Sequence, residues 1–308
     1  MNMMQNNSGI KARPLSEMIG EVAVIAAIQV SALGMTRLDR RASTQADISH
    51  GAKSGTGKVS VKRLPGAETA VDAIKAKHTQ ARAVLNGRTT RWGKDRKLLM
   101  NQFIGEVCGE IDEIVRDHDK LRDKFVADAY AYIQNAQYNL GSYDVAPPTV
   151  AEIENAFSLS LELSPVPNIS AYTTGDSELE KSMRARFEAD IQSAYEGAQK
   201  DLMKRLAEPL ENMVNRMAAY EERQKRQEAE EDVGKTGTFK STVITNITDL
   251  ATLVRSFNIT GDPVLTDLSN KLDAFEGIDH KALISSADLR ADTARRAAEI
   301  RASLANWL

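Results

Sequence analysis

Residues 104–130 read IGEVCGEIDEIVRDHDKLRDKFVADAY and carry the clearest periodicity in the chain. Apolar positions recur here every three or four residues, the spacing that places them on one face of an α-helix. The stripe consists of Val107, Ile111, Ile114, His118, Leu121, Phe125 and Tyr132. No proline interrupts residues 98–140, and Gly141 follows them. We therefore expect one helix over residues 98–140, about 60 Å long.

A second long helix is expected after Thr174-Gly175-Asp176. Apolar residues recur along it at helical spacing, Pro209 interrupts it, and its tail at 221–232 is almost entirely charged or Gln. Two long helices with narrow apolar stripes are typical of coiled coils, which often bury further apolar surface by forming homo-oligomers. We expect the interface between chains to use the first stripe. Its predicted members are Val107, Ile111, Ile114, Leu121, Phe125 and Tyr132.

The best strand signal is Phe157–Leu163, where apolar and polar residues alternate before Ser164-Pro165-Val166-Pro167. Val22–Val30 is rich in β-branched residues and is its expected partner. The fold class is therefore predicted to be mainly α: long antiparallel coiled-coil helices with a small β element at the base and a C-terminal helical region.

The predicted domain order follows the chain from end to end. It consists of a flexible tail at 1–14, an N-terminal α+β part with a basic loop at 15–97, a long helical hairpin at 98–232 interrupted by a strand segment at 156–167, a linker at 233–238, and a helical region at 239–308 with helices over 239–257, 263–275 and 280–305.

The composition of the 308 residues excludes several classes of protein. A single cysteine, Cys108, excludes an intrachain disulfide and a Cys-rich zinc site, and it fits a reducing compartment. The most apolar stretch, Val22–Leu33, is too short to span a membrane. Glu17 and Glu21 precede it, which argues against a signal peptide. We expect a cytoplasmic protein, in a bacterial host cell, with no membrane partner.

The net charge of -3 conceals a split along the chain. Residues 37–97 hold 15 Lys and Arg against 5 Asp and Glu, whereas residues 98–308 hold 23 against 36. Two interpretations stay open: a phosphate-binding surface with Trp92 as a stacking ring, or pairing with acidic helices of the same chain or a neighbour. The candidate nucleic-acid-binding residues are Arg37, Arg40, Arg41, Lys53, Lys58, Lys62, Arg63, Arg88, Arg91, Trp92, Lys94, Arg96 and Lys97.

One segment of this region, AKSGTGKV at 52–59, is close to a phosphate-binding loop. That loop needs a preceding buried strand, a following helix, and Ser or Thr after the lysine to hold Mg²⁺. Here Val59 stands at the Ser/Thr position, the preceding residues are polar, and the following ones alternate as a strand does. The segment is therefore interpreted as a flexible basic loop.

Catalytic and metal-binding patterns also fail on their spacing. Glu110, Glu113 and Asp117 lie near His118, but Val115 stands where a helical-bundle metal site needs glutamate. His118 falls on the apolar stripe, which favours a buried or interfacial position. No nucleophile-elbow, kinase or dinucleotide motif is present. The sequence predicts a protein that is not an enzyme, with no cofactor and no metal.

The order of these elements resembles a family of uncharacterised bacteriophage and prophage proteins, often encoded near MoxR-like AAA ATPases. The resemblance rests on the apolar N-terminal strand, the loop ending at residues 62–66 (KRLPG), the helix closing on residues 85–87 (LNG), and the strand followed by residues 165–167 (PVP). It covers about residues 20–255. It implies a phage setting and partnership with an AAA ATPase or host machinery.

Together these patterns predict a non-enzymatic, self-associating coiled-coil interaction protein, encoded by a phage. Its expected partners are a second copy of itself and a host or phage protein, such as a defence or replication factor. The alternative is a nucleic-acid-binding protein that uses the basic region 37–97.

Overall fold

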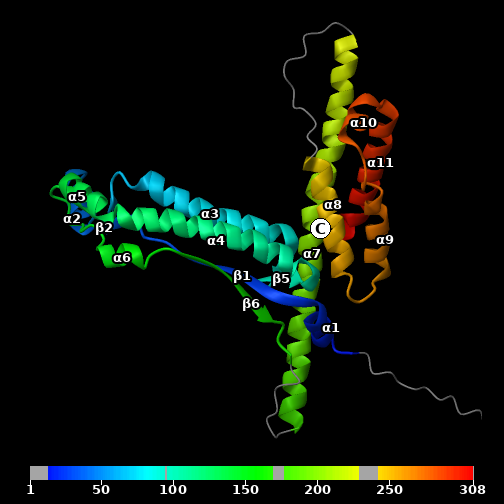
Figure 1. The fold of residues 1–308 in the computed structure, drawn as a ribbon, viewed down its shortest axis with the longest axis horizontal. Helices are drawn as coiled ribbons and strands as arrows, with labels where there is room; N and C mark the ends of the chain where they lie inside the picture. The colour runs from blue at the N-terminus through cyan, green and yellow to red at the C-terminus, as the bar shows by residue number, and fades with distance from the viewer. Residues whose placement is uncertain (1–12, 94–95, 169–176, 229–241, 308) are drawn as a thin grey trace, which may run out of the picture. The chain divides into compact units, whose positions relative to one another are not determined.

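The computed structural model describes residues 13–93, 96–168, 177–228 and 242–307, which form a mainly helical fold with small antiparallel β elements (Figure 1). Residues 1–12 of the predicted tail and the whole predicted linker 233–238 lie outside these residues. The fold divides into two compact units. Unit 1 takes the described residues of Met1–Ala26, Gly87–Gln102 and Ser164–Leu308, and unit 2 takes Ala27–Asn86 and Phe103–Leu163.

This division differs from the predicted domain order, because the chain passes between the units several times. The passages lie within β1 (Ala23–Ser31), near the end of α3 (Glu68–Arg88), after β5 (Arg96–Met100) and within β6 (Ser158–Pro165). Each unit is therefore assembled from segments that are distant in the sequence, and no border at residue 97 separates two domains.

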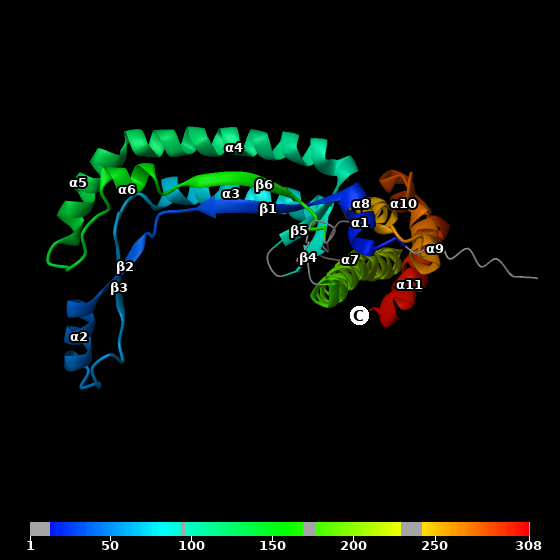
Figure 2. The same cartoon turned by 90° about the horizontal axis from the view of Figure 1, so that it is seen from below.

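Unit 2 has two long helices side by side, α3 and α4 (Figure 2). Lys77 of α3 pairs with Asp117 of α4 at 3.1 Å, and the rings of His78 and His118 lie 5.1 Å apart between the same helices. The further elements of this unit are β2 (Thr36–Asp39), α2 (Arg40–Ser49), β3 (Val59–Lys62), α4 (Ile104–Ala127), α5 (Ala129–Leu140) and α6 (Val150–Glu154), with parts of β1 and β6.

The stripe predicted to contact a second chain lies inside the protein's own core. Phe125 packs against Tyr132 and, edge-on, against Phe157, with ring centroids 5.2 and 5.7 Å apart. Leu121 packs on the same cluster, and the stripe's remaining members Val107, Ile111 and Ile114 are buried. The prediction of an intermolecular interface on these residues is therefore wrong. An amphipathic pattern shows that a face is covered, but it does not show whether the cover is a second chain or α3.

The predicted partnership of the two strand segments is confirmed, since β1 and β6 are neighbours. Gln29 donates to Glu162 at 2.7 Å, and the hydroxyl groups of Ser31 and Ser158 lie 2.8 Å apart. In unit 1, the first four residues of β1 pair antiparallel with β5, which also pairs with β4 (Thr89–Trp92).

The expected helix over residues 98–140 is wrong at its start and near its middle. Residues 98–100 are β-strand rather than the start of a helix, and the helix proper begins at Ile104. The expected single helix also breaks at Asp128, between α4 and α5. The error at the start arises because short apolar runs fit a strand and a helix equally well.

Unit 1 is built around α7 (Ser177–Glu228), which continues through Pro209. Helices α8 (Thr242–Phe257), α9 (Pro263–Asp273) and α11 (Ala287–Ser303) lie beside it or beside one another, as Figure 1 shows. The predicted helix over 280–305 is split at Ser286, whose hydroxyl accepts the N–H of Leu289 and so caps α11. The remaining elements of unit 1 are α1 (Leu15–Val22), α10 (His280–Ser285) and the short turns Asn101–Phe103 and Leu304–Asn306.

Candidate nucleic-acid interface

A small module of unit 2 carries the first part of the basic region. Strands β2 and β3 pair antiparallel from Thr36↔Lys62 to Asp39↔Val59, and α2 with the loop 50–58 connects them. Figure 2 shows α2 standing off from α3 and α4, at the end where α5 and α6 lie. We call residues 36–62 the basic module. Helix α2 was not predicted, because its sequence RRASTQADIS contains only one large apolar residue, Ile48.

The basic module has six lysine and arginine side chains, all exposed, and five of them form no ion pair with a side chain that the structure describes. These five are Arg37, Arg40, Arg41, Lys53 and Lys58. The two arginines at 40 and 41 start α2, where the helix dipole already contributes positive charge. Their placement therefore adds to a positive surface instead of neutralising a negative one.

Both carboxylates of the basic module are buried. Asp39 caps α2 by accepting the N–H of Ala42 at 2.8 Å, and it also accepts the N–H of Asp144 at 2.7 Å. These backbone hydrogen bonds, the one from Ala42 first, lower the pKa of Asp39. Asp47 accepts the N–H groups of Gly55 and Gly57, each at 2.7 Å. The surface of the module is thus cationic, because its two negative charges face inward onto backbone amides.

The loop that resembles a phosphate-binding motif is folded around Asp47. The two glycine N–H groups that could hold a phosphate are occupied by this carboxylate. Gly55 has a φ of 89°, a conformation that favours glycine, and a Cβ added at Gly57 would lie 2.9 Å from the Oδ1 atom of Asp47. The hydrogen bonds to Asp47 therefore hold the loop that carries Lys53 and Lys58. The loop does not form a phosphate-binding site.

Other members of the basic region are neutralised within their own unit. Lys62 pairs with Glu68 at 2.8 Å, and Arg63 pairs with Glu152 at 3.2 Å. Glu152 is held in turn by a capping box with Thr149, at the start of α6. Arg63 thus pairs with an acidic helix of the same chain, as the second interpretation expects, whereas the partner of Lys62 lies within the basic region 37–97 itself.

The cations of residues 88–97 belong to unit 1. Arg88 pairs with Asp249 at 3.4 Å, and the guanidinium of Arg91 donates to the carbonyl of Gly93 at 2.9 Å. Burial lowers the pKa of Lys97, and Lys94 lies outside the described residues. Arg96 is exposed. The predicted set is therefore divided between two units.

The ring of Trp92 is only 6% exposed. A base cannot stack on a ring that other side chains cover. The expectation that Trp92 serves as a stacking ring is therefore wrong. Trp92 lies in the short strand β4, where its side chain is buried in the core of unit 1.

Comparisons with family models, with curated proteins and with solved structures find no match to this chain. Within the described ranges, no helix is both long enough and apolar enough to cross a membrane. The described side chains also form no group of three or more His, Cys, Asp or Glu that could hold a metal ion.

Two exposed tyrosines next to the basic module were missed by the sequence analysis. Tyr138 near the end of α5 is 87% exposed, and Tyr143 in the following loop is 50% exposed. The next residue, Asp144, donates its N–H to Asp39, the residue that caps α2. One feature of the sequence could have found Tyr138. It is a large aromatic residue that does not fall on the apolar stripe continuing to Tyr132, so packing in the core does not explain it.

A pair of buried histidines lies between α3 and α4. His118 is buried, as its place on the stripe predicts, and its Nδ1 atom lies 3.0 Å from a carboxylate oxygen of Asp119. The Nε2 atoms of His78 and His118 have no hydrogen-bond partner among the described atoms. Burial lowers the pKa of His78, and its electrostatic interactions with His118, Arg82 and Lys75 act in the same direction.

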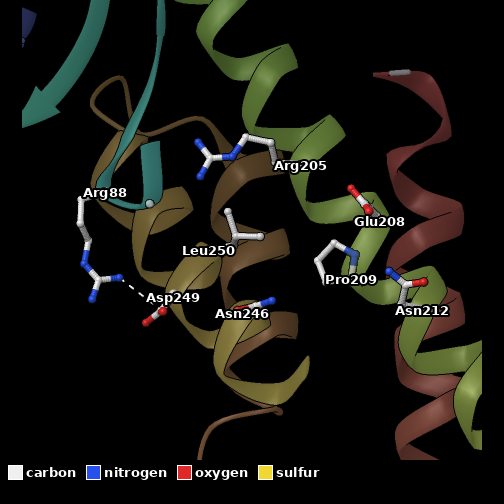
Figure 3. Close-up of a pocket in the computed structure, with 9 residues that line it drawn as sticks. Arg88, Arg205, Glu208, Pro209, Asn212, Asn246, Asp249 and Leu250 are labelled. Atoms are coloured by element: carbon white, nitrogen blue, oxygen red, sulfur yellow. Dashed lines mark ion pairs between the residues drawn. The ribbon is translucent and has the colours of Figure 1, made fainter. Parts of the chain in front are cut away.

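Unit 1 contains a polar pocket of about 370 Å³ (Figure 3). Arg205 reaches from α7 to the carbonyl of Thr89 at 2.6 Å, and burial lowers the pKa of this guanidinium. The lining residues are Gly87, Arg88, Arg205, Glu208, Pro209, Asn212, Asn246, Asp249 and Leu250. The lining includes two guanidinium groups and two carboxylates, so its formal charges balance.

Proposed function

We propose that this protein binds nucleic acid through the basic module. The observation that supports the proposal is the arrangement of its charges: five exposed cations without a described ion-pair partner, above two buried carboxylates that backbone amides satisfy. Exposed cations on a compact surface attract the phosphate backbone and release its counterions. An acidic protein surface would satisfy the same charges, and the experiment below separates the two.

The number of cations sets the salt dependence. If all five contact phosphates, the slope of log affinity against log salt is about -3.5 for a single strand and about -4.5 for a duplex. Raising the salt concentration from 50 to 200 mM should then weaken binding by roughly 100- to 500-fold. A slope near zero would mean that the module makes no phosphate contacts.

The test is fluorescence anisotropy of labelled DNA and RNA oligonucleotides titrated with the protein at several salt concentrations. The variant is Arg40→Gln with Arg41→Gln, which should weaken binding and reduce the salt slope by roughly 1.4 to 1.8. The matched control is Lys124→Gln with Lys281→Gln, which removes the same charge from exposed positions outside the module. Absence of binding at 50 mM salt, or equal effects of the two double variants, would refute the proposal.

Self-association as an interaction protein is the second candidate. The first turns of α7 expose Leu179 and Met183 by 48% and 38%, and these positions share a helix face. The antiparallel coiled coil between residues 98–140 and 177–232, the phage setting, and an AAA ATPase or host factor as partner stay predictions. The molar mass in solution, measured by light scattering, tests self-association directly.

A further inference from the structure

The exposed tyrosines beside the basic module are held by the way α5 ends. Gly141 follows the helix with a φ of 52°, and Tyr143 donates its N–H to the carbonyl of Leu140 at 3.0 Å. This turn directs the chain from the exposed ring of Tyr138 to the exposed ring of Tyr143 within five residues. Both rings therefore belong to one short segment, residues 138–143, which we call the tyrosine turn.

A hydrogen bond from Asp144, the residue that follows the tyrosine turn, connects this segment to the start of α2. The N–H of Asp144 and the N–H of Ala42 both donate to the carboxylate of Asp39. Tyr143 is thus one residue away from this carboxylate on one side, and Arg40 is one residue away on the other. The Cα atoms of Tyr143 and Arg40 are consequently at most about 15 Å apart, by the lengths of the bonds between them. The backbone at Tyr143 therefore lies close to the start of α2.

The tyrosine turn itself carries no negative charge. Helix α5, AYAYIQNAQYNL, contains no charged residue. In the following loop, GSYDVAPPT at 141–149, the only acidic residue is Asp144. The turn thus brings no negative charge of its own to a polyanion that contacts Arg40 and Arg41.

We infer that the ligand of the basic module is single-stranded nucleic acid, whose unpaired bases stack on Tyr138 and Tyr143. The inference rests on the proposed function and adds the form of the strand. Exposed aromatic rings next to a cationic surface are the combination by which proteins hold single strands, since a stacked base needs a free face. In a duplex both faces of a base are already covered by its neighbours, so the rings would contribute nothing there.

The test compares a labelled single strand, DNA or RNA, with a duplex of the same length in the anisotropy assay. In the variant Tyr138→Leu with Tyr143→Leu, affinity for the single strand should fall about tenfold or more, while the salt slope stays unchanged. The conservative variant Tyr138→Phe with Tyr143→Phe keeps both rings and should bind as the wild type does. Tyr130→Leu is the matched control, because Tyr130 is 67% exposed at the other end of α5.

The possible results separate this inference from the proposed function. If the duplex binds as tightly as the single strand and the leucine variants bind normally, while the arginine variants are weakened, the inference is refuted and the proposed function stands. Equal losses in the Leu and Phe variants would also refute it, because a stacking role needs only the ring. If no oligonucleotide binds at low salt, both proposals fail.

Discussion

Replacing Asp47 with asparagine should loosen the loop that carries Lys53 and Lys58. The carboxylate is buried and accepts two short hydrogen bonds, from the N–H groups of Gly55 and Gly57. Asparagine has nearly the same size, but only one of its two terminal atoms accepts a hydrogen bond. Its NH₂ group would face one of the two glycine N–H groups, and two donors cannot form a hydrogen bond with each other.

The expected effect follows from the number of hydrogen bonds that are lost. A hydrogen bond to a charged group contributes about 1.5–3 kcal/mol, and the substitution removes one of the two and the charge from the other. We expect the local free energy of opening to fall by about 2–3 kcal/mol. This corresponds to hydrogen exchange at the Gly55 and Gly57 amides that is roughly 30- to 150-fold faster.

Hydrogen exchange measured by NMR or mass spectrometry reads this opening directly at residues 51–58. Asp72→Asn is the matched control, because Asp72 is an exposed carboxylate on α3 of the same unit. It should leave exchange in the loop unchanged. If Asp47→Asn also leaves the glycine amides protected as in the wild type, the argument that the carboxylate supports the loop is wrong.

Two further predictions concern buried groups in the two units. Burial lowers the pKa of His78 below the 6.5 of an unfolded chain, so the unfolded state binds more protons than the folded state just below that pH. The free energy of unfolding should therefore fall as the pH drops below about 6.5, and it should fall less in His78→Gln. Urea unfolding at several pH values measures this difference. Arg290→Leu should lower the midpoint of thermal unfolding of unit 1 by several degrees. The buried guanidinium donates to the carbonyls of Leu283 and Ile284 and lies 4.8 Å from the ring of Tyr220, and leucine loses these contacts. Calorimetry measures the midpoint, and an unchanged value would show that these contacts contribute nothing to stability.

Features that depend on local pattern could be predicted from the sequence. The apolar stripe of α4 predicted its buried face, including His118. Alternation predicted β6, and β-branched residues predicted its neighbour β1. In each case the residues that carry the signal are close together, so that the physical cause and its effect fall within one short window.

Apart from the pairing of β1 with β6, features that depend on distant partners could not be predicted. Asp47 lies in a polar segment, so its sequence context does not distinguish it from an exposed acidic residue. It is buried because its carboxylate accepts the N–H groups of Gly55 and Gly57, eight and ten residues later. The neighbour of Tyr143 at the start of α2 is more than 100 residues away in the sequence. The basic region likewise divides between the units because of chain passages that no composition reveals.

The way the chain alternates between the units also has a consequence for its synthesis. Unit 2 draws only on residues 27–86 and 103–163, so the ribosome has made all of it once residue 163 is added. Unit 1 still needs α11, which ends at Ser303. At about 5–20 residues per second, roughly 7–28 seconds of translation separate the two points. The nascent chain can thus present a complete basic module to a ligand while the last helices are still being made.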